Sequence, residues 1–133
     1  MSLFSAMSIA RSGLDAATRR LEVSASNIAN LRTTGPAPGA DGTTTAYRAL
    51  TVRQTDATGG GVLSEIVPRD PGWTVEPGPG DPNADARGLV AAPNVDLVTE
   101  TSDLLMARIG YAAAAEVMKV ADDMQKTATD MFV

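Results

Sequence analysis

The sequence predicts a mainly α protein: long N- and C-terminal helices paired as a coiled coil, with a small β-ribbon and loop insertion between them. Apolar residues recur every seven positions near both ends of the 133-residue chain, which is the spacing of a coiled-coil seam. The middle of the chain is rich in Gly and Pro and holds only short β-prone runs. We therefore divide the chain into residues 1–35, 36–93 and 94–133.

The first helix is expected to start near Ser2 or Ser5, either of which can cap exposed amides. It should stop between Asn30 and Gly35, because Gly35 can adopt the left-handed conformation that ends a helix and the next residue is Pro. Two heptad lines follow this segment: Met7, Leu14, Leu21 and Ile28, and then Leu3, Ala10, Ala17, Ser24 and Leu31. So narrow a stripe is marginal for a lone helix in water, so the segment requires a partner helix.

The second helix is expected from Leu97 to about Phe132, with Asn94 or Asp96 as its cap. It also has two heptad lines: Leu97, Leu104, Tyr111, Met118 and Phe132, interrupted at Gln125, and the small residues Ala107, Ala114, Ala121 and Ala128. Small residues that face Leu and Met let two helix axes approach closely. Periodicity alone is equally consistent with an amphipathic helix that packs on its own domain.

Between the helices, Tyr47–Arg53 and Val62–Val67 are predicted to form a two-stranded ribbon joined by a Gly-rich turn. Such a ribbon is marginally stable alone, so it must pack on another element. Residues 68–88 are dense in Pro and Gly, and we expect a loop that Trp73 anchors to the ribbon or to a neighbour. Residues 89–95 are expected to be a short extended piece.

Composition limits the possible functions. Aromatic residues make up only 4% of the chain, so Ala, Gly and other small residues must fill the interior. The net charge is −5 and no basic patch is interleaved with aromatics, which argues against nucleic acid as a partner. No apolar run is long enough to span a bilayer. The N-terminus also lacks the charged and apolar regions of a cleaved secretory signal.

Catalysis and cofactor binding are disfavoured in the same way. The chain has no Cys and no His, so the commonest general base, the thiol nucleophile and two common metal ligands are missing. Ser and Thr are abundant, but no base is available to activate one. The sequence therefore predicts a protein that is not an enzyme, with no cofactor and no catalytic residue.

Two acidic groups were tested as metal or catalytic sites. The run from Asp81 to Asp85 resembles the start of a calcium loop, but Ala86 and Ala92 replace the expected Gly and Glu. We interpret it as a polar turn in which side chains bond nearby amides. Likewise, Glu100 and Asp103 are expected to lie in a solvated first helical turn that complements the helix dipole, not to form a reactive carboxylate pair.

The segment Ser26-Asn27-Ile28-Ala29-Asn30 near the end of the first helix is more informative. Asn is a poor residue for a helix interior. The presence of Asn27 and Asn30 in the last turns therefore suggests side chains that bond to the backbone or to a neighbouring chain. The alternative is an ordinary frayed helix end that Asn caps.

The same stretch resembles a known family. Residues 10–35 read ARSGLDAATRRLEVSASNIANLRTTG, which is similar to the N-terminal signature of bacterial flagellar axial proteins, the rod, hook and hook-associated subunits. The C-terminal run GDPNADARGLVAAPNVDLVTETSDLLMARIGYAAAAEVMKVADDM resembles the matching block of the proximal rod subunits. The features shared are an Asp-Pro turn, a Pro-Asn-Val-Asp helix entry and a Tyr in mid-helix.

This resemblance implies a structural subunit of the basal-body rod, the hollow shaft that transmits motor torque and surrounds the export channel. Partners would be copies of the chain, other rod subunits, and the export gate and basal-body ring at the rod base. The implied location is the periplasm-spanning rod, reached by type III export without a cleaved signal. The residues expected to pack in the assembly are Met7, Leu14, Leu21, Ser26, Asn27, Ile28, Asn30, Gly35, Leu104, Tyr111 and Met118.

Two alternatives stay open at this point. Another flagellar axial or adapter subunit would share the N-terminal block but would lack the Pro-Asn-Val-Asp helix entry. A soluble adapter built as a helical hairpin would be a stable monomer with full helicity.

Overall fold

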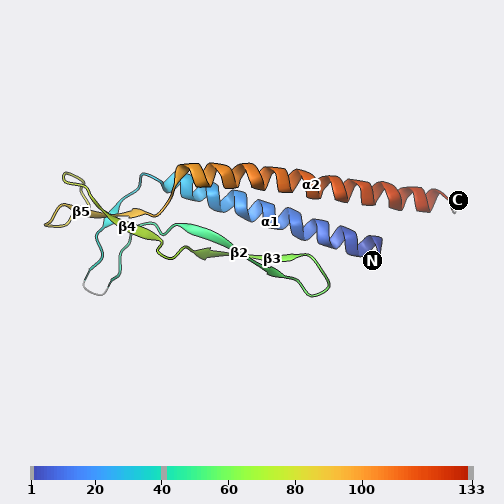
Figure 1. Ribbon diagram of the computed structural model, residues 1–133, viewed down its shortest axis with the longest axis horizontal. Helices are drawn as coiled ribbons and strands as arrows, with labels where there is room; N and C mark the ends of the chain where they lie inside the picture. Colours follow the sequence, from blue (N-terminus) through green and yellow to red (C-terminus); the bar gives the residue numbers. More distant parts are fainter. Residues whose placement is uncertain (1, 40–41, 132–133) are drawn as a thin grey trace.

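The computed structural model describes residues 2–39 and 42–131, which form two long helices and two small sheets. The helices lie side by side (Figure 1). Both described ends of the chain lie at the same end of the helix pair, far from strands β4 and β5. The elements in order are α1 (Leu3–Asn30), β1 (Gly35–Pro36), β2 (Leu50–Asp56), β3 (Val62–Pro68), β4 (Trp73–Pro77), β5 (Leu89–Pro93) and α2 (Leu97–Asp130). The predicted fold class, long terminal helices that pack together with a small β insertion between them in the sequence, is confirmed.

The helix starts follow the predicted caps. The Ser2 side chain accepts a hydrogen bond from the Ser5 amide, and the Asp96 carboxylate accepts one from the Thr99 amide at 2.7 Å. Such caps satisfy amides that have no partner inside the helix. The predicted end of α2 near Phe132 falls beyond the described residues.

Gly35 does not end α1 as expected. The helix ends at Asn30. Leu31 caps it in the right-handed helical conformation, and the Leu31 amide donates a hydrogen bond to the Ile28 carbonyl. Gly35 itself does not have a positive φ. Gly35 instead lies in β1 against Ala46, where an added Cβ would stand only 2.6 Å from the Ala46 Cα. The position therefore requires Gly because two backbone segments touch there.

The strands form two antiparallel sheets. In the first, β5 lies between β1 and β4, with Gly35 opposite Ala91 and Trp73 opposite Pro93. In the second, β2 and β3 form the predicted ribbon, although β2 begins at Leu50 rather than at Tyr47. The expectation of a loop over 68–88 was wrong for β4, which pairs on one side only and so tolerates the flanking Pro residues.

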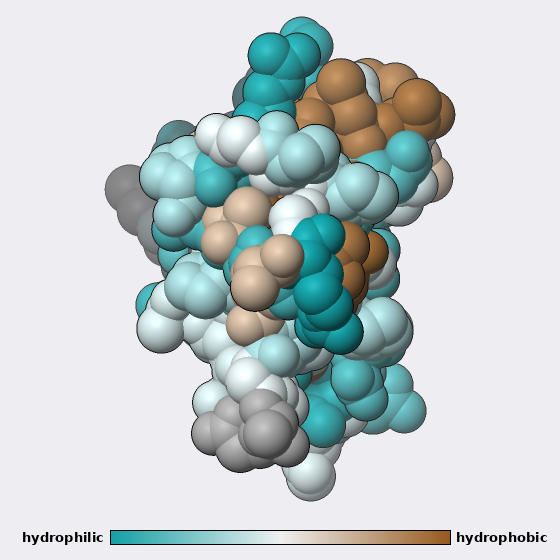
Figure 2. Space-filling view, turned by 90° about the vertical axis from the view of Figure 1, so that its left-hand side faces the viewer, coloured by the Kyte–Doolittle hydropathy of each residue, from teal (hydrophilic) through white to brown (hydrophobic). Residues whose placement is uncertain are grey.

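The ribbon packs against α1, and so does α2, so α1 lies between them (Figure 1). Viewed from the end that carries β4 and β5, the surface is largely hydrophilic (Figure 2). The largest hydrophobic area of this view lies near its top, at the level of α2. Thus α1 is covered on two sides, whereas α2 packs mainly on α1 and meets Arg69 near its start.

Candidate assembly site

The two helices meet through their small residues. The buried members of the contact are Ala10, Ala17 and Ser24 on α1 and Glu100, Ala107 and Ala121 on α2. Close to the middle of the contact, a Cβ added to Gly13 would stand 3.4 Å from the Ala114 Cβ. Small side chains allow this close approach of the axes, so the heptad lines of Ala form the intramolecular seam.

The larger predicted residues lie beside this seam and are only partly covered. They form what we call the apolar face: Met7, Leu14, Leu21, Ile28, Leu104, Tyr111 and Met118. Leu21 remains 47% exposed and Tyr111 50% exposed, and the other five are half-buried. Since the helices are antiparallel, both large heptad lines turn to the same side of the pair, away from the ribbon. The structure therefore brings these seven residues together on one surface.

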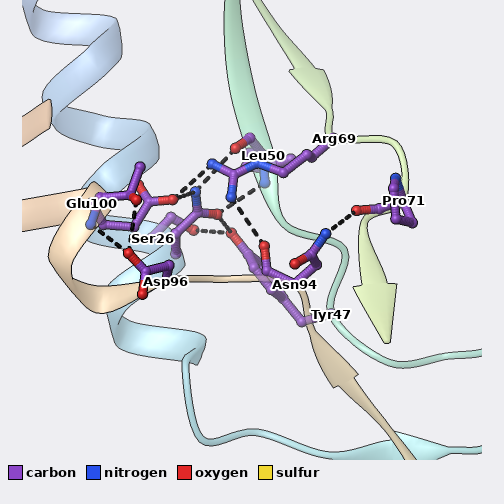
Figure 3. Close-up of polar contacts among 10 residues, drawn as sticks. Ser26, Tyr47, Leu50, Arg69, Pro71, Asn94, Asp96 and Glu100 are labelled. Carbon is purple, nitrogen blue, oxygen red and sulfur yellow. Dashed lines mark hydrogen bonds and ion pairs between the residues drawn. The ribbon is translucent and has the colours of Figure 1, made fainter. Parts of the chain in front are cut away.

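A buried polar cluster joins the helices to the ribbon (Figure 3). Asn27 is fully buried, and its amide nitrogen donates to the Leu50 carbonyl and to Glu100 Oε1, both at 3.0 Å. Its amide oxygen accepts from the Leu50 amide at 2.9 Å and from the Tyr47 hydroxyl at 3.1 Å. One side chain of α1 thus bonds to α2, to the start of β2 and to the segment before it.

Glu100 corrects the expectation of a solvated first turn. Its side chain is only 1% exposed and accepts a hydrogen bond from Arg69 Nη2 at 2.8 Å. Arg69 also donates to the Asn94 carbonyl at 3.0 Å. A buried carboxylate needs such partners because removing it from water is costly. Asp103, by contrast, is exposed as expected.

The other two polar residues of the helix end also bond within the chain. Ser26 Oγ lies 2.8 Å from the Tyr47 hydroxyl, and Asn30 donates to the Ser26 carbonyl at 2.9 Å. The Asn30 side chain thus bonds within the last turn, as a capping Asn would, whereas Ser26 and Asn27 tie this end of the helix to other elements, so it is not frayed. Arg69 and Tyr47 were missed from the sequence, where the only signal of a polar partner was the pair of Asn residues.

The acidic run near β5 is the polar turn that was expected. Asp81 accepts hydrogen bonds from the Asn83 amide and the Thr34 hydroxyl, both at 2.8 Å, and these bonds hold the pKa of Asp81 below its usual value. Asp85 accepts from the Leu89 amide at 2.9 Å, a bond that likewise lowers the pKa of Asp85. Both carboxylates are thus engaged in shaping the loop.

Comparison with known proteins identifies the family. Residues 7–36 match the family model described as flagella basal body rod protein, and residues 86–131 match that of the flagellar basal body rod FlgEFG protein C-terminal. The chain is 36% identical to the flagellar basal-body rod protein FlgC of Agrobacterium fabrum, over 98% of this chain and 95% of the relative. The chain belongs to the FlgC family. FlgC of Salmonella typhimurium is 39% identical, over 97% of this chain and 98% of its own length.

Membership in the FlgC family confirms the predicted rod subunit. The chain is a structural component of the flagellar basal-body rod, not an enzyme, and it assembles with other rod subunits. The two matched blocks contain most of α1 and α2. No helix in the described part of the chain is long and apolar enough to cross a membrane.

Proposed function

We propose that this FlgC-family chain builds the proximal part of a hollow rod, in which its helix pair packs around a central export channel and the assembled shaft transmits motor torque. The observation that carries the proposal is the uncovered apolar surface of the helix pair. Tyr111 is half exposed on one side of α2, and Met106 and Met124 are about 60% exposed on the other. Monomeric proteins rarely expose large apolar patches, so large apolar side chains left exposed along a helix favour contact with other subunits.

The partners that would cover this surface are copies of the chain and other rod subunits, with the export gate and the basal-body ring at the rod base. Contacts between unlike faces generate a helical shaft when they do not close into a ring. We place the chain in the periplasm-spanning rod and assign its export to the flagellar type III apparatus without a cleaved signal, as the family resemblance implies.

Within the chain, we assign residues 1–35 and 94–133 to the axial tube and residues 36–93 to its outer insertion. The apolar face contacts neighbours, which its partial exposure supports. Ser26, Asn27, Asn30 and Gly35 act indirectly, because their contacts lie inside the chain. They hold the helix end and the sheets in the arrangement that neighbours recognise.

Mass spectrometry of purified basal bodies from the source bacterium tests this function. The chain is expected there and should resist salt and mild detergent. Leu21→Asp should prevent incorporation while the ribbon stays folded, because a charge on the apolar face cannot be buried without a partner. Ser8→Asp is the matched control, since Ser8 is exposed on α1 away from the apolar face.

Absence of the unaltered chain from intact basal bodies would refute the proposal and favour a soluble adapter with the same fold. Normal incorporation of Leu21→Asp would refute the role of the apolar face alone.

A further inference from the structure

A groove runs along α1 on the side of the ribbon, with α2 as its opposite wall. Three hollows of about 240, 180 and 390 Å³ follow one another along it. The hollow nearest the polar cluster is lined by charged groups that include Arg20 and Asp103. The farthest hollow is apolar and is lined by Ile9, Gly13 and Val117. The groove is therefore polar at one end and apolar at the other.

Gly110 lines the middle hollow, and no contact within the described chain requires a glycine there. A Cβ added there would meet nothing within 4 Å, although Gly in a helix interior costs about 1 kcal/mol relative to Ala. Gly13 on the opposite wall is different, because the Ala114 Cβ lies close to it. Gly110 thus leaves open space on the wall of the groove, where another helix can approach.

Within the described residues, the last turns of α2 carry exposed apolar side chains, although Ala121 among them is buried against α1. Gly13 lies against Ala114 and α1 starts at Leu3, so α2 continues past the end of α1 (Figure 1). Met124 is 59% exposed and Met131 80% exposed. Together with Val120, Asp123, Thr127 and Ala128, they line a further apolar hollow. We call residues 120–131 the overhang.

We propose that the groove of one copy receives the overhang of a second copy. This inference rests on the proposed assembly into the rod and names the contact between two copies. A shift of two heptads between parallel α2 helices keeps their faces in phase and corresponds to about 21 Å along the axis. It places Met124 beside Gly110 and Met131 beside Val117. Met side chains are long and flexible, so they fit irregular hollows of this kind.

Charge supports the same alignment. Arg20 lines the groove, and its side chain donates to the neutral Gln54 amide oxygen at 2.6 Å. Asp123, on the overhang, forms no ion pair with any residue in 2–39 or 42–131. Because Asn27 bonds to Glu100 and Gly13 packs on Ala114, Arg20 lies at the level of Ala107. The shift therefore brings Asp123 within about one helical turn of Arg20 along the axis.

The contact joins two different surfaces, so a pair of copies still has one free groove and one free overhang. Each added copy presents a new groove and a new overhang, which is the condition for open helical growth. The apolar face on the other side of the helix pair stays available for other subunits.

Disulfide trapping in assembled rods tests the contact, since the chain has no native Cys. The double variant Gly110→Cys with Met124→Cys is expected to form a ladder of disulfide-linked copies in purified basal bodies. The matched control, Gly110→Cys with Lys119→Cys, should not, because Lys119 lies on a different face of α2. A ladder of equal strength from the control, or incorporated double variant without a ladder, would overturn the inference. Cross-links only to a different rod protein would also overturn it.

A substitution pair covers the case in which the double variant fails to assemble. Gly110→Trp has space in the isolated chain, so circular dichroism should show undiminished helicity, but the indole fills the groove and incorporation should be lost. Gly110→Ala adds one methyl group and should be incorporated normally. Normal incorporation of Gly110→Trp would refute the occupied groove and leave the rod function intact. Absence of the unaltered chain from basal bodies would refute both.

Discussion

Replacing Asn27 by Ala is the sharpest test of the polar cluster. Asn27 is fully buried and its amide group takes part in four hydrogen bonds, which reach α2, the start of β2 and Tyr47. Ala keeps the helix and removes every one of these bonds. The variant therefore measures what the cluster contributes to holding the helices and the ribbon together.

The expected loss follows from the groups left behind. Both backbone groups of Leu50 lose their bond to Asn27, whereas Glu100 loses one bond but keeps that from Arg69. Leaving a buried polar group unpaired costs about 1–3 kcal/mol. Two such groups, together with the bond that Glu100 loses and with partial rescue by entering water, give a loss of about 3–5 kcal/mol in the free energy of unfolding. Domains of this size have only about 5–15 kcal/mol, so the variant should be severely destabilised.

Urea unfolding of the purified chain, followed by circular dichroism, measures this loss. Asn30→Ala is the matched control, because Asn30 is half-buried and its side chain makes a single bond to the described residues, to the Ser26 carbonyl. Its loss should be about 0.5–1.5 kcal/mol. Equal losses for the two variants, or a loss below about 1 kcal/mol for Asn27→Ala, would refute the reasoning.

Three further predictions concern the caps and the close contacts. Gly35→Ala should destabilise the chain by about 1–3 kcal/mol, because the new Cβ would stand 2.6 Å from the Ala46 Cα; thermal unfolding measures this. Asp96→Ala removes the bonds to Thr99 that cap α2, so it should lower the urea midpoint but leave the helical spectrum before the transition unchanged. Hydrogen bonds, chiefly from Thr99, lower the pKa of Asp96 from 3.8, and the Asn83 amide does the same for Asp81. The stability that these carboxylates contribute is present above pH 3.8 and should be lost as pH falls through their folded pKa values; a urea midpoint that does not fall in this acid range would contradict it.

The heptad pattern predicted both helices, and the Ser and Asp residues before them predicted their caps. The pattern did not show which heptad line, the large or the small residues, forms the seam between the two helices. Lines of large and of small residues have the same period, so the sequence alone does not rank them. In the structure Ala107 is buried and Tyr111 remains half exposed. The small line packs inside the chain because it lets the axes approach, and the large line stays partly exposed.

Burial of charge was equally invisible in the sequence. A Glu in the first turn of a helix is usually solvated, so Glu100 looked ordinary in the sequence. Only the fold places Arg69, thirty-one positions away, beside it. Asn27 was found because Asn is unfavourable inside a helix, which is a local property. Strand β4 was missed because Pro and Gly suppress the local β signal, whereas pairing with β5 is a tertiary effect.

The pairing of α1 with α2 joins the two ends of the chain, and this has a consequence for synthesis. Gly13 meets Ala114 and Asn27 meets Glu100, so α1 cannot bury its seam until the ribosome has made almost the whole protein. At a synthesis rate of about 5–20 residues per second, several seconds pass between the synthesis of α1 and that of α2. Contacts this distant in sequence also slow folding itself. The nascent chain therefore spends its early life with an uncovered amphipathic segment, during which a cellular factor that recognises such segments has time to bind it.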